Sequence, residues 1–94
     1  MAESIMQHDR SHCLMCLRAM PLEEHHVMGG TANRKLSEQY GLKVYICPYC
    51  HRISRDAVHK SAERSNALKA YAQSCFQLRY PDLDFVKIFG RNYL

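Results

Sequence analysis

The chain has no long apolar run, no internal repeat and no low-complexity segment. The lack of an apolar stretch of about 18–20 residues excludes a helix that crosses a bilayer. The lack of a repeating period excludes an architecture of stacked repeats. The first twelve residues, MAESIMQHDRSH, are polar and contain no apolar signal core, so we expect a protein that is not secreted.

The 94 residues suffice for one domain, and a hydrophobic content of 47% is typical of a globular protein. A chain this short buries only about 60–65% of its unfolded surface and is often stabilised by a metal or by disulfide bonds. The net charge of +4 arises from 13 Lys and Arg against 9 Asp and Glu. This charge weakly favours a polyanionic partner, and an ordinary solvated surface explains it equally well.

Four of the five cysteines form two pairs, CLMC and CPYC, with thirty residues between them. In a protein that is not secreted, this pattern favours a metal site over disulfide bonds, which remain the alternative. Four thiolates suit tetrahedral Zn²⁺ and leave no open coordination position, so we predict a structural zinc on Cys13, Cys16, Cys47 and Cys50. Cys75 lies on an apolar helical stripe and is predicted to be a buried side chain rather than a ligand.

The local patterns predict an α+β domain. Residues 1–12 are expected to form a loose lead-in. Strands are predicted over 22–28 and 42–46, because these segments are β-rich and the second alternates. A short helix over 32–40 is expected between them, with Thr31 as its N-cap and Gly41 at its C-terminal end.

The second half of the chain has a helical pattern from the residue after His51 onward. Its apolar positions follow the spacing of an amphipathic helix and are Leu68, Tyr71, Ala72, Cys75 and Phe76. The helix should end at Tyr80-Pro81, and a last short helix should follow, with Asp82 as its cap and Gly90 as its stop. The C-terminal aromatics Phe85, Phe89 and Tyr93 could form a dimer face, and core packing is the alternative.

Four histidines lie inside or just after the cysteine frame, namely His25, His26, His51 and His59. Adjacent residues of a strand point to opposite faces. One of the first two could therefore meet His51 and His59 around a divalent ion while the other faces a bound substrate. A neutral imidazole can deprotonate water near neutral pH, and a metal with open positions stabilises charge on a phosphate. This layout indicates metal-assisted phosphodiester hydrolysis. His8 and His12 in the lead-in are predicted to be exposed.

The segments CLMC, EEHHVMGG, VYICPYCHR and AVH, within residues 13–60, resemble the HNH (ββα-metal) nucleases, in particular their small phage-type, zinc-framed members. The resemblance implies a ββα-metal (His-Me finger) fold and one nuclease domain over 13–94. Its zinc-framed core would span about 13–64 and a helical C-terminal extension about 65–94. The resemblance also implies DNA as the substrate, products with 5′-phosphate ends, and a phage- or prophage-encoded protein in the cytoplasm of a bacterial host.

Carried over residue by residue, the resemblance implies that His26 is the general base and His25 a metal ligand. His51, His59 or both would supply the further ligands. Asn33 is the candidate for the family's middle asparagine, which fixes the loop that bears the base; an ordinary polar residue in a first helical turn is the alternative. Imidazole ligands suit Zn²⁺, Ni²⁺ or Mn²⁺ better than Mg²⁺, and the catalytic metal stays open among these four.

Arg34, Arg52 and Arg55 lie near the expected site in the sequence and are candidates for contacts with DNA phosphates, with ordinary surface arginines as the alternative. The family suggests phage packaging or recombination proteins as partners, and either a monomer or a homodimer. A second hypothesis for the function is a non-catalytic, zinc-ribbon-like module that binds DNA or protein. A third places all the His and Cys ligands in two structural zinc sites. Under the nuclease hypothesis, loss of His26 would abolish the activity. Under the other two hypotheses, His26 would be dispensable.

Overall fold

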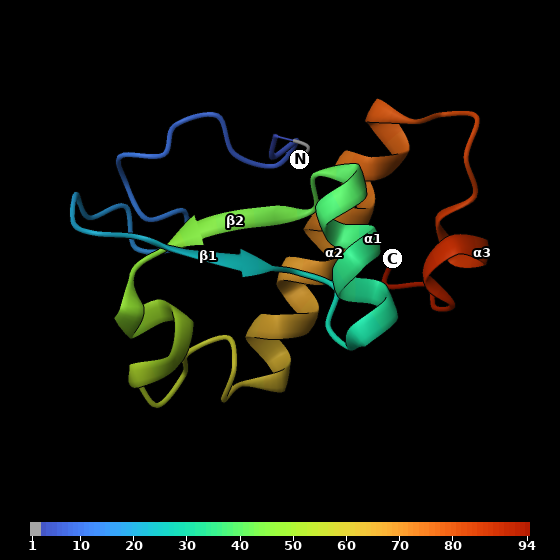
Figure 1. The fold of residues 1–94 in the computed structure, drawn as a ribbon. Helices are drawn as coiled ribbons and strands as arrows, with labels where there is room; N and C mark the ends of the chain where they lie inside the picture. Colours follow the sequence, from blue (N-terminus) through green and yellow to red (C-terminus); the bar gives the residue numbers. More distant parts are fainter. Residues whose placement is uncertain (1–2) are drawn as a thin grey trace.

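Two short antiparallel strands lie at the centre of the fold (Figure 1). The computed structural model describes residues 3–94. Strand β1 (Glu23–His26) pairs with strand β2 (Lys43–Ile46), so both predicted strands are present, and β1 is shorter than predicted. Together with the helices, they make a small α+β fold. No helix within the described range is long and apolar enough to cross a bilayer.

Helix α1 (Thr31–Tyr40) forms the connection between the two strands. Thr31 is its first residue and no side chain caps it; Gly30 precedes it with a φ of 89°, so the predicted Thr31 cap is wrong. The physical reason is that only glycine readily adopts the positive φ at this turn. The predicted end at Gly41 is confirmed, with a φ of 74°. A Cβ atom there would clash with the carbonyl oxygen of Glu3.

After β2 the chain enters a short π-helix, η1 (Tyr49–Ile53), and the long helix α2 (Ala62–Arg79) starts only later. The helix predicted to start directly after His51 is therefore wrong over residues 54–60. The oxygen of the Ser61 side chain accepts a backbone N–H of the first turn of α2, which explains where that helix begins.

The segment between η1 and α2 folds back onto η1. The backbone N–H of Val58 donates to the carbonyl of Cys50, and that of His59 donates to the carbonyl of His51. Ala57 and Val58, which belong to this segment, are buried. His59 consequently lies in a turn that is tied to the second cysteine pair, and not in the opening turns of a helix.

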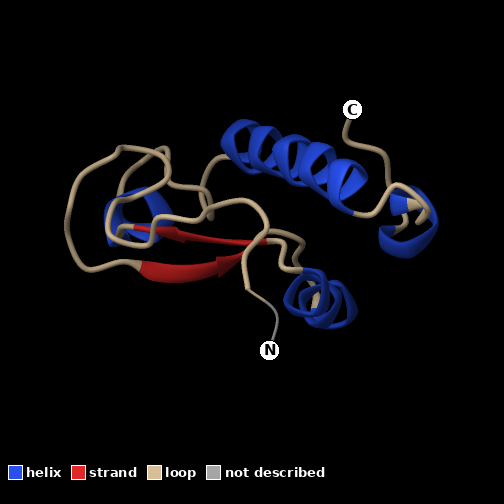
Figure 2. Ribbon diagram, turned by 90° about the horizontal axis from the view of Figure 1, so that it is seen from above, coloured by secondary structure: helices blue, strands red, loops and turns tan. Residues whose placement is uncertain are grey.

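The hydrophobic core lies where α2 meets the sheet and helix α3 (Phe85–Phe89). Figure 2 shows α2 along one side of the sheet and α1 beyond the ends of the strands, and Tyr40 of α1 packs against Phe76 of α2. The most buried residues include Val44, Ile46, Ala72, Phe76 and Phe85. Helix α2 ends before Pro81 as predicted.

Three details of the C-terminal part bear on the predictions from the sequence: the cap of α3, the burial of the aromatic side chains and the apolar stripe of α2. Asp84, and not Asp82, caps α3, because its carboxylate lies in reach of the N–H of Lys87. Phe85 and Phe89 are buried inside the chain, which confirms core packing for this pair. On the predicted stripe of α2, Tyr71 is exposed and Cys75 is only partly buried; Leu68, Ala72 and Phe76 are buried.

The N-terminal segment packs along the free edge of β2, so a loose lead-in is wrong for the described residues from Ser4 onward (Figure 1). The side-chain amide of Gln7 accepts the N–H of Tyr45 at 2.7 Å and donates to its carbonyl at 3.2 Å. The side chain of Gln7 thus takes the place of a neighbouring strand, and this satisfies backbone groups that burial would otherwise leave unpaired. His8 and His12 are exposed, as predicted.

Candidate metal centres and the histidine cavity

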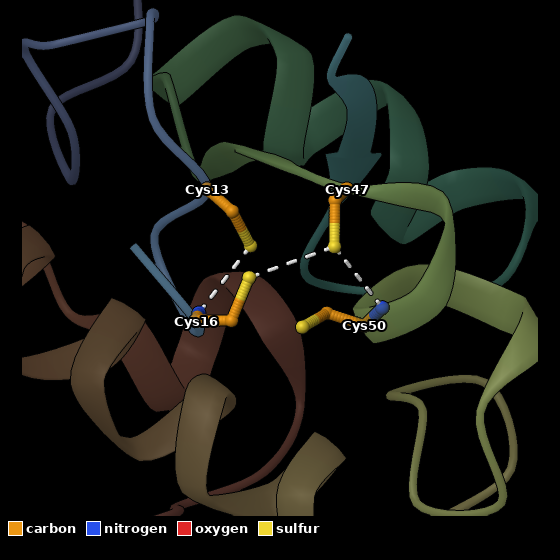
Figure 3. Close-up of side chains that lie close together, drawn as sticks. All are labelled: Cys13, Cys16, Cys47 and Cys50. Carbon is orange, nitrogen blue, oxygen red and sulfur yellow. Dashed lines mark hydrogen bonds between the residues drawn. The ribbon is translucent and has the colours of Figure 1, made fainter. Parts of the chain in front are cut away.

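The four paired cysteines converge on one point (Figure 3). The Sγ atoms of Cys13, Cys16, Cys47 and Cys50 all lie within 4.8 Å of one another, and none is in a disulfide. Cys16 Sγ and Cys47 Sγ are 3.7 Å apart. Two sulfur ligands on tetrahedral zinc are separated by about 3.8 Å, given a Zn–S distance of about 2.3 Å. The cluster is therefore compatible with zinc and lies between the segment before β1 and the end of β2.

Backbone groups support the thiolates. The N–H of Cys16 points at Cys13 Sγ, and the N–H of Cys50 points at Cys47 Sγ (Figure 3). Burial by itself would raise the pKa of the Cys13 thiol, but hydrogen bonds from several backbone N–H groups bring this pKa down to about 6. Burial and the neighbouring sulfurs raise the pKa of the Cys50 thiol. Four thiolates can therefore coexist here only around a cation.

A second cluster is made by three imidazoles on the other side of the second cysteine pair. His25 comes from β1, His51 from η1 and His59 from the turn before α2, and one nitrogen of each lies within 4.8 Å of the others. The Nε2 atoms of His51 and His59 are 2.8 Å apart. Two nitrogens on tetrahedral zinc are separated by about 3.3 Å. This value lies between the 2.8 Å that separates His51 from His59 and the 4.8 Å within which all three rings lie. The predicted association of all three histidines is thus present in the structure.

Glu23 supports this histidine cluster from the same face of β1. Its Oε1 lies 2.9 Å from Nδ1 of His51, which leaves Nε2 of that ring to face the cluster. The guanidinium of Arg52 donates two hydrogen bonds to the Glu23 carboxylate, at 3.0 and 2.8 Å. The hydrogen bonds from Arg52 and His51 lower the pKa of Glu23 to about 2. An ionised carboxylate behind a ligand histidine fixes its tautomer and its ring orientation.

Two imidazoles of the cluster are held in the neutral form, which is the form that binds metals. Burial, followed by the proximity of His51 and His59, lowers the pKa of His25 to about 4. Burial and the neighbouring His51 also lower the pKa of His59. The three imidazoles, each with one nitrogen within 4.8 Å of the others, form a possible donor set for a divalent cation.

His26 points to the opposite face of β1, as the strand alternation predicts. Its Nε2 lies 3.0 Å from Oε1 of Glu38 on α1 and 3.5 Å from Oε1 of Glu24. Lys43, which lies opposite His26 in the strand pair, is buried and contacts both carboxylates. The hydrogen bonds from Lys43 and His26 lower the pKa of Glu38.

One cavity of about 300 Å³ joins the two faces at the free edge of β1. It is lined by the three clustered histidines and by His26, and also by Gly29, Gly30 and Arg34 at the start of α1. His26 therefore shares one cavity with the three histidines of the cluster. A small polar group bound in the cavity could contact both.

The other predicted site residues lie at different distances from this cavity. Arg34 lines it, whereas the guanidinium of Arg52 is held by Glu23, and Arg55 is exposed in the turn after η1. Asn33 points toward α3, where its amide donates to the carbonyl of Phe89 at 3.5 Å. Asn33 is not among the residues that line the cavity.

Sequence reasoning missed three residues of the site. Glu23 was predictable in principle, since it precedes His25 by two positions and so shares its face of the strand. Lys43 becomes a partner of His26 only through the strand register, and Glu38 only through the docking of α1. Neither has a local sequence signal.

Comparisons of the chain with protein-family models, with curated protein sequences and with solved structures found no match.

Proposed function

We propose that the chain is a metal-dependent endonuclease that hydrolyses DNA phosphodiester bonds, with His26 as the general base. The single observation behind this proposal is the shared cavity: a three-histidine donor set and a fourth histidine outside it line the same space. The order of these histidines along the chain also agrees with the resemblance to the HNH (ββα-metal) nucleases.

The two clusters differ in the chemistry that they suit. Four cysteines fill all positions of a tetrahedral zinc, so that site would be structural. His25, His51 and His59 leave at least one position open, which is the pattern of a catalytic site. A divalent ion held there would stabilise the charge on the phosphate and on the leaving oxygen.

The residues of the chain would perform the remaining steps. His26 takes a proton from a water molecule, whose oxygen then bonds to phosphorus. The bond from phosphorus to the 3′-oxygen breaks, and that oxygen is protonated by solvent. The products carry a 5′-phosphate and a 3′-hydroxyl. His26 is suited to this role because its Nε2 is held by carboxylates and its Nδ1 takes part in none of the hydrogen bonds found in residues 3–94.

The surroundings of the cavity suit a phosphate. Arg34 lies at its rim in the first turn of α1, a turn that contains no acidic residue. The guanidinium carries a fixed positive charge and can bond two phosphate oxygens. The net charge of +4 favours the approach of a polyanion. Phosphate contacts of this kind hold DNA without reading its sequence.

The test is cleavage of supercoiled plasmid by purified protein with Mn²⁺, Mg²⁺, Ni²⁺ or Zn²⁺. His26→Ala is compared with His8→Ala, a matched loss of an exposed histidine far along the chain. Both variants must keep wild-type folding and zinc content. Metal-dependent nicking that is lost only in His26→Ala supports the proposal. Equal cleavage by both variants would refute His26 as the base.

One observation favours a non-catalytic zinc module as the second candidate. His26 is largely shielded from solvent and contacts two carboxylates, as a purely structural histidine can. A module of this kind would bind DNA or protein without cleavage under any metal, and its binding would tolerate His26→Ala. Binding without cleavage in the plasmid assay would therefore select this alternative.

A further inference from the structure

The carboxylates beside His26 decide which of its nitrogens carries the hydrogen. Glu38 and Glu24 both approach the same atom, Nε2, at 3.0 and 3.5 Å. A carboxylate only accepts hydrogen bonds, so a nitrogen that faces two of them must carry a hydrogen. Nδ1 then carries the lone pair of the neutral ring. The arrangement therefore selects one tautomer and leaves Nδ1 as the nitrogen that can take a proton.

Glu38 is itself held in place from two directions. The ammonium of Lys43 donates to its second oxygen at 2.7 Å, and Lys43 is only 2% exposed. Its neighbour on α1, Ser37, is fully buried and bonds both the N–H and the carbonyl of Met28, just after β1. Helix α1 is thus fixed against the end of β1, and the Glu38 carboxylate cannot readily leave His26.

A metal site is the competing interpretation of these groups, since one ligand atom each of Glu24, His26 and Glu38 lie within 4.8 Å of one another. The ammonium of Lys43 already contacts both carboxylates, at 2.7 and 3.6 Å. A divalent cation among them would be repelled by this charge at close range. The cluster is therefore suited to hold an imidazole and unsuited to bind a metal.

We propose that Glu38 is the positioning residue of His26 and that Lys43 holds Glu38 in this role. The expected effect on kcat rests on the proposed nuclease function. The expected tautomer of His26 rests on the geometry alone. When Nδ1 accepts the proton from water, the ring becomes an imidazolium, and its Nε2–H remains bonded to a carboxylate of opposite charge. Such a carboxylate orients the base and stabilises the cation that forms. The third turn of α1 then fills the role that the family resemblance gives to Asn33.

The structural half of the test uses nitrogen NMR of histidine-labelled, zinc-loaded protein at neutral pH. In the wild type we expect the His26 ring to show a hydrogen on Nε2 and none on Nδ1. In Glu38→Gln we expect this preference to be lost or averaged between the two tautomers. Gln39→Ala, an exposed change next to Glu38 on α1, should leave the His26 signals as they are. A wild-type ring that exchanges freely between tautomers, or a signal unchanged in Glu38→Gln, would overturn the proposal.

The kinetic half uses plasmid nicking with a saturating metal. Glu38→Gln should lower kcat by at least about 10²-fold, the range in which a misplaced acid–base group acts. KM for DNA and the metal content of both sites should stay unchanged, and Glu38→Asp should restore part of kcat. A loss of kcat in Asn33→Ala that Glu38→Gln does not share would assign the role to Asn33 instead.

Together, the NMR and kinetic experiments distinguish the positioning role of Glu38 from the nuclease function. A fixed tautomer that depends on Glu38, in a protein that cuts no DNA, would retain the positioning role and reject the nuclease. Cleavage that depends on His26 but not on Glu38 would retain the nuclease and reject the positioning role.

Discussion

The pair formed by Glu23 and His51 leads to a quantitative prediction about metal affinity. Glu23→Gln preserves the shape of the side chain and removes its charge. The contact at 2.9 Å to Nδ1 of His51 then loses its ionic character, and so do both hydrogen bonds from Arg52. Loss of a carboxylate behind a ligand histidine lowers metal affinity by about 10–100-fold. That range corresponds to about 1.4–2.7 kcal/mol of binding free energy.

The assay is a titration of the histidine cluster with Co²⁺ in protein whose four cysteines already hold zinc. The absorption of the cobalt complex reports the geometry of the site, and calorimetry gives the affinity. Arg52→Gln is the matched control, because it leaves the contact between Glu23 and His51 in place. We expect it to weaken binding less than Glu23→Gln does.

Two results would refute the reasoning. If Glu23→Gln binds Co²⁺ as tightly as the wild type, then His51 is not a ligand or its orientation does not depend on Glu23. If the variant loses zinc from the cysteines, then Glu23 supports the fold of η1 rather than the histidine site.

Three more predictions concern stability. Leu17 has a φ of 65° and is 71% exposed, so Leu17→Gly should relieve a left-handed backbone at little packing cost and stabilise the protein by about 1 kcal/mol, measured as a rise in Tm. Removal of zinc by a strong chelator, or Cys47→Ser, should unfold the chain, because a structural zinc site supplies free energy comparable to the whole stability of a small domain. Circular dichroism measures the loss of helix. A folded, metal-free protein would contradict this prediction. With only the cysteine site loaded, His25 has a pKa of about 4 when folded and about 6.5 when unfolded, so the unfolded chain binds more protons between these values and stability falls as pH falls. From pH 7 to 5.5 the wild type should lose about 1 kcal/mol more than His25→Gln in denaturant titrations, and parallel losses in the two proteins would count against the buried, neutral ring.

The sequence predicted those parts of the site that depend on local spacing. The two CxxC pairs were sufficient to predict the sulfur cluster, because each turn brings two thiolates together by itself. The alternation of β1 correctly separated His25 from His26, because neighbouring strand residues always face opposite ways. The end of α1 at Gly41 was predictable, because glycine is the residue that most readily adopts the left-handed backbone at the end of a helix.

The remaining features depend on contacts between distant segments. His59 was expected in a helix, but the turn that carries it is held by backbone hydrogen bonds to η1, which no periodicity signals. The partners of His26 come from α1 and β2 and meet only when the sheet and helix are assembled. The polar lead-in looked loose because its hydrophobic pattern is weak, whereas its actual attachment is a side-chain amide bonded to a strand edge.

The chain connects its two clusters through a single turn of backbone. Cys50 and His51 are neighbours in η1, and the turn that carries His59 is bonded to the carbonyls of both. An ion at the cysteines would order this turn and so assemble two of the three imidazoles before any second ion arrives. Metal loading should therefore follow a fixed sequence, with the sulfur site first and the nitrogen site second. Without zinc at the cysteines, added manganese or nickel should therefore find no assembled histidine site to bind.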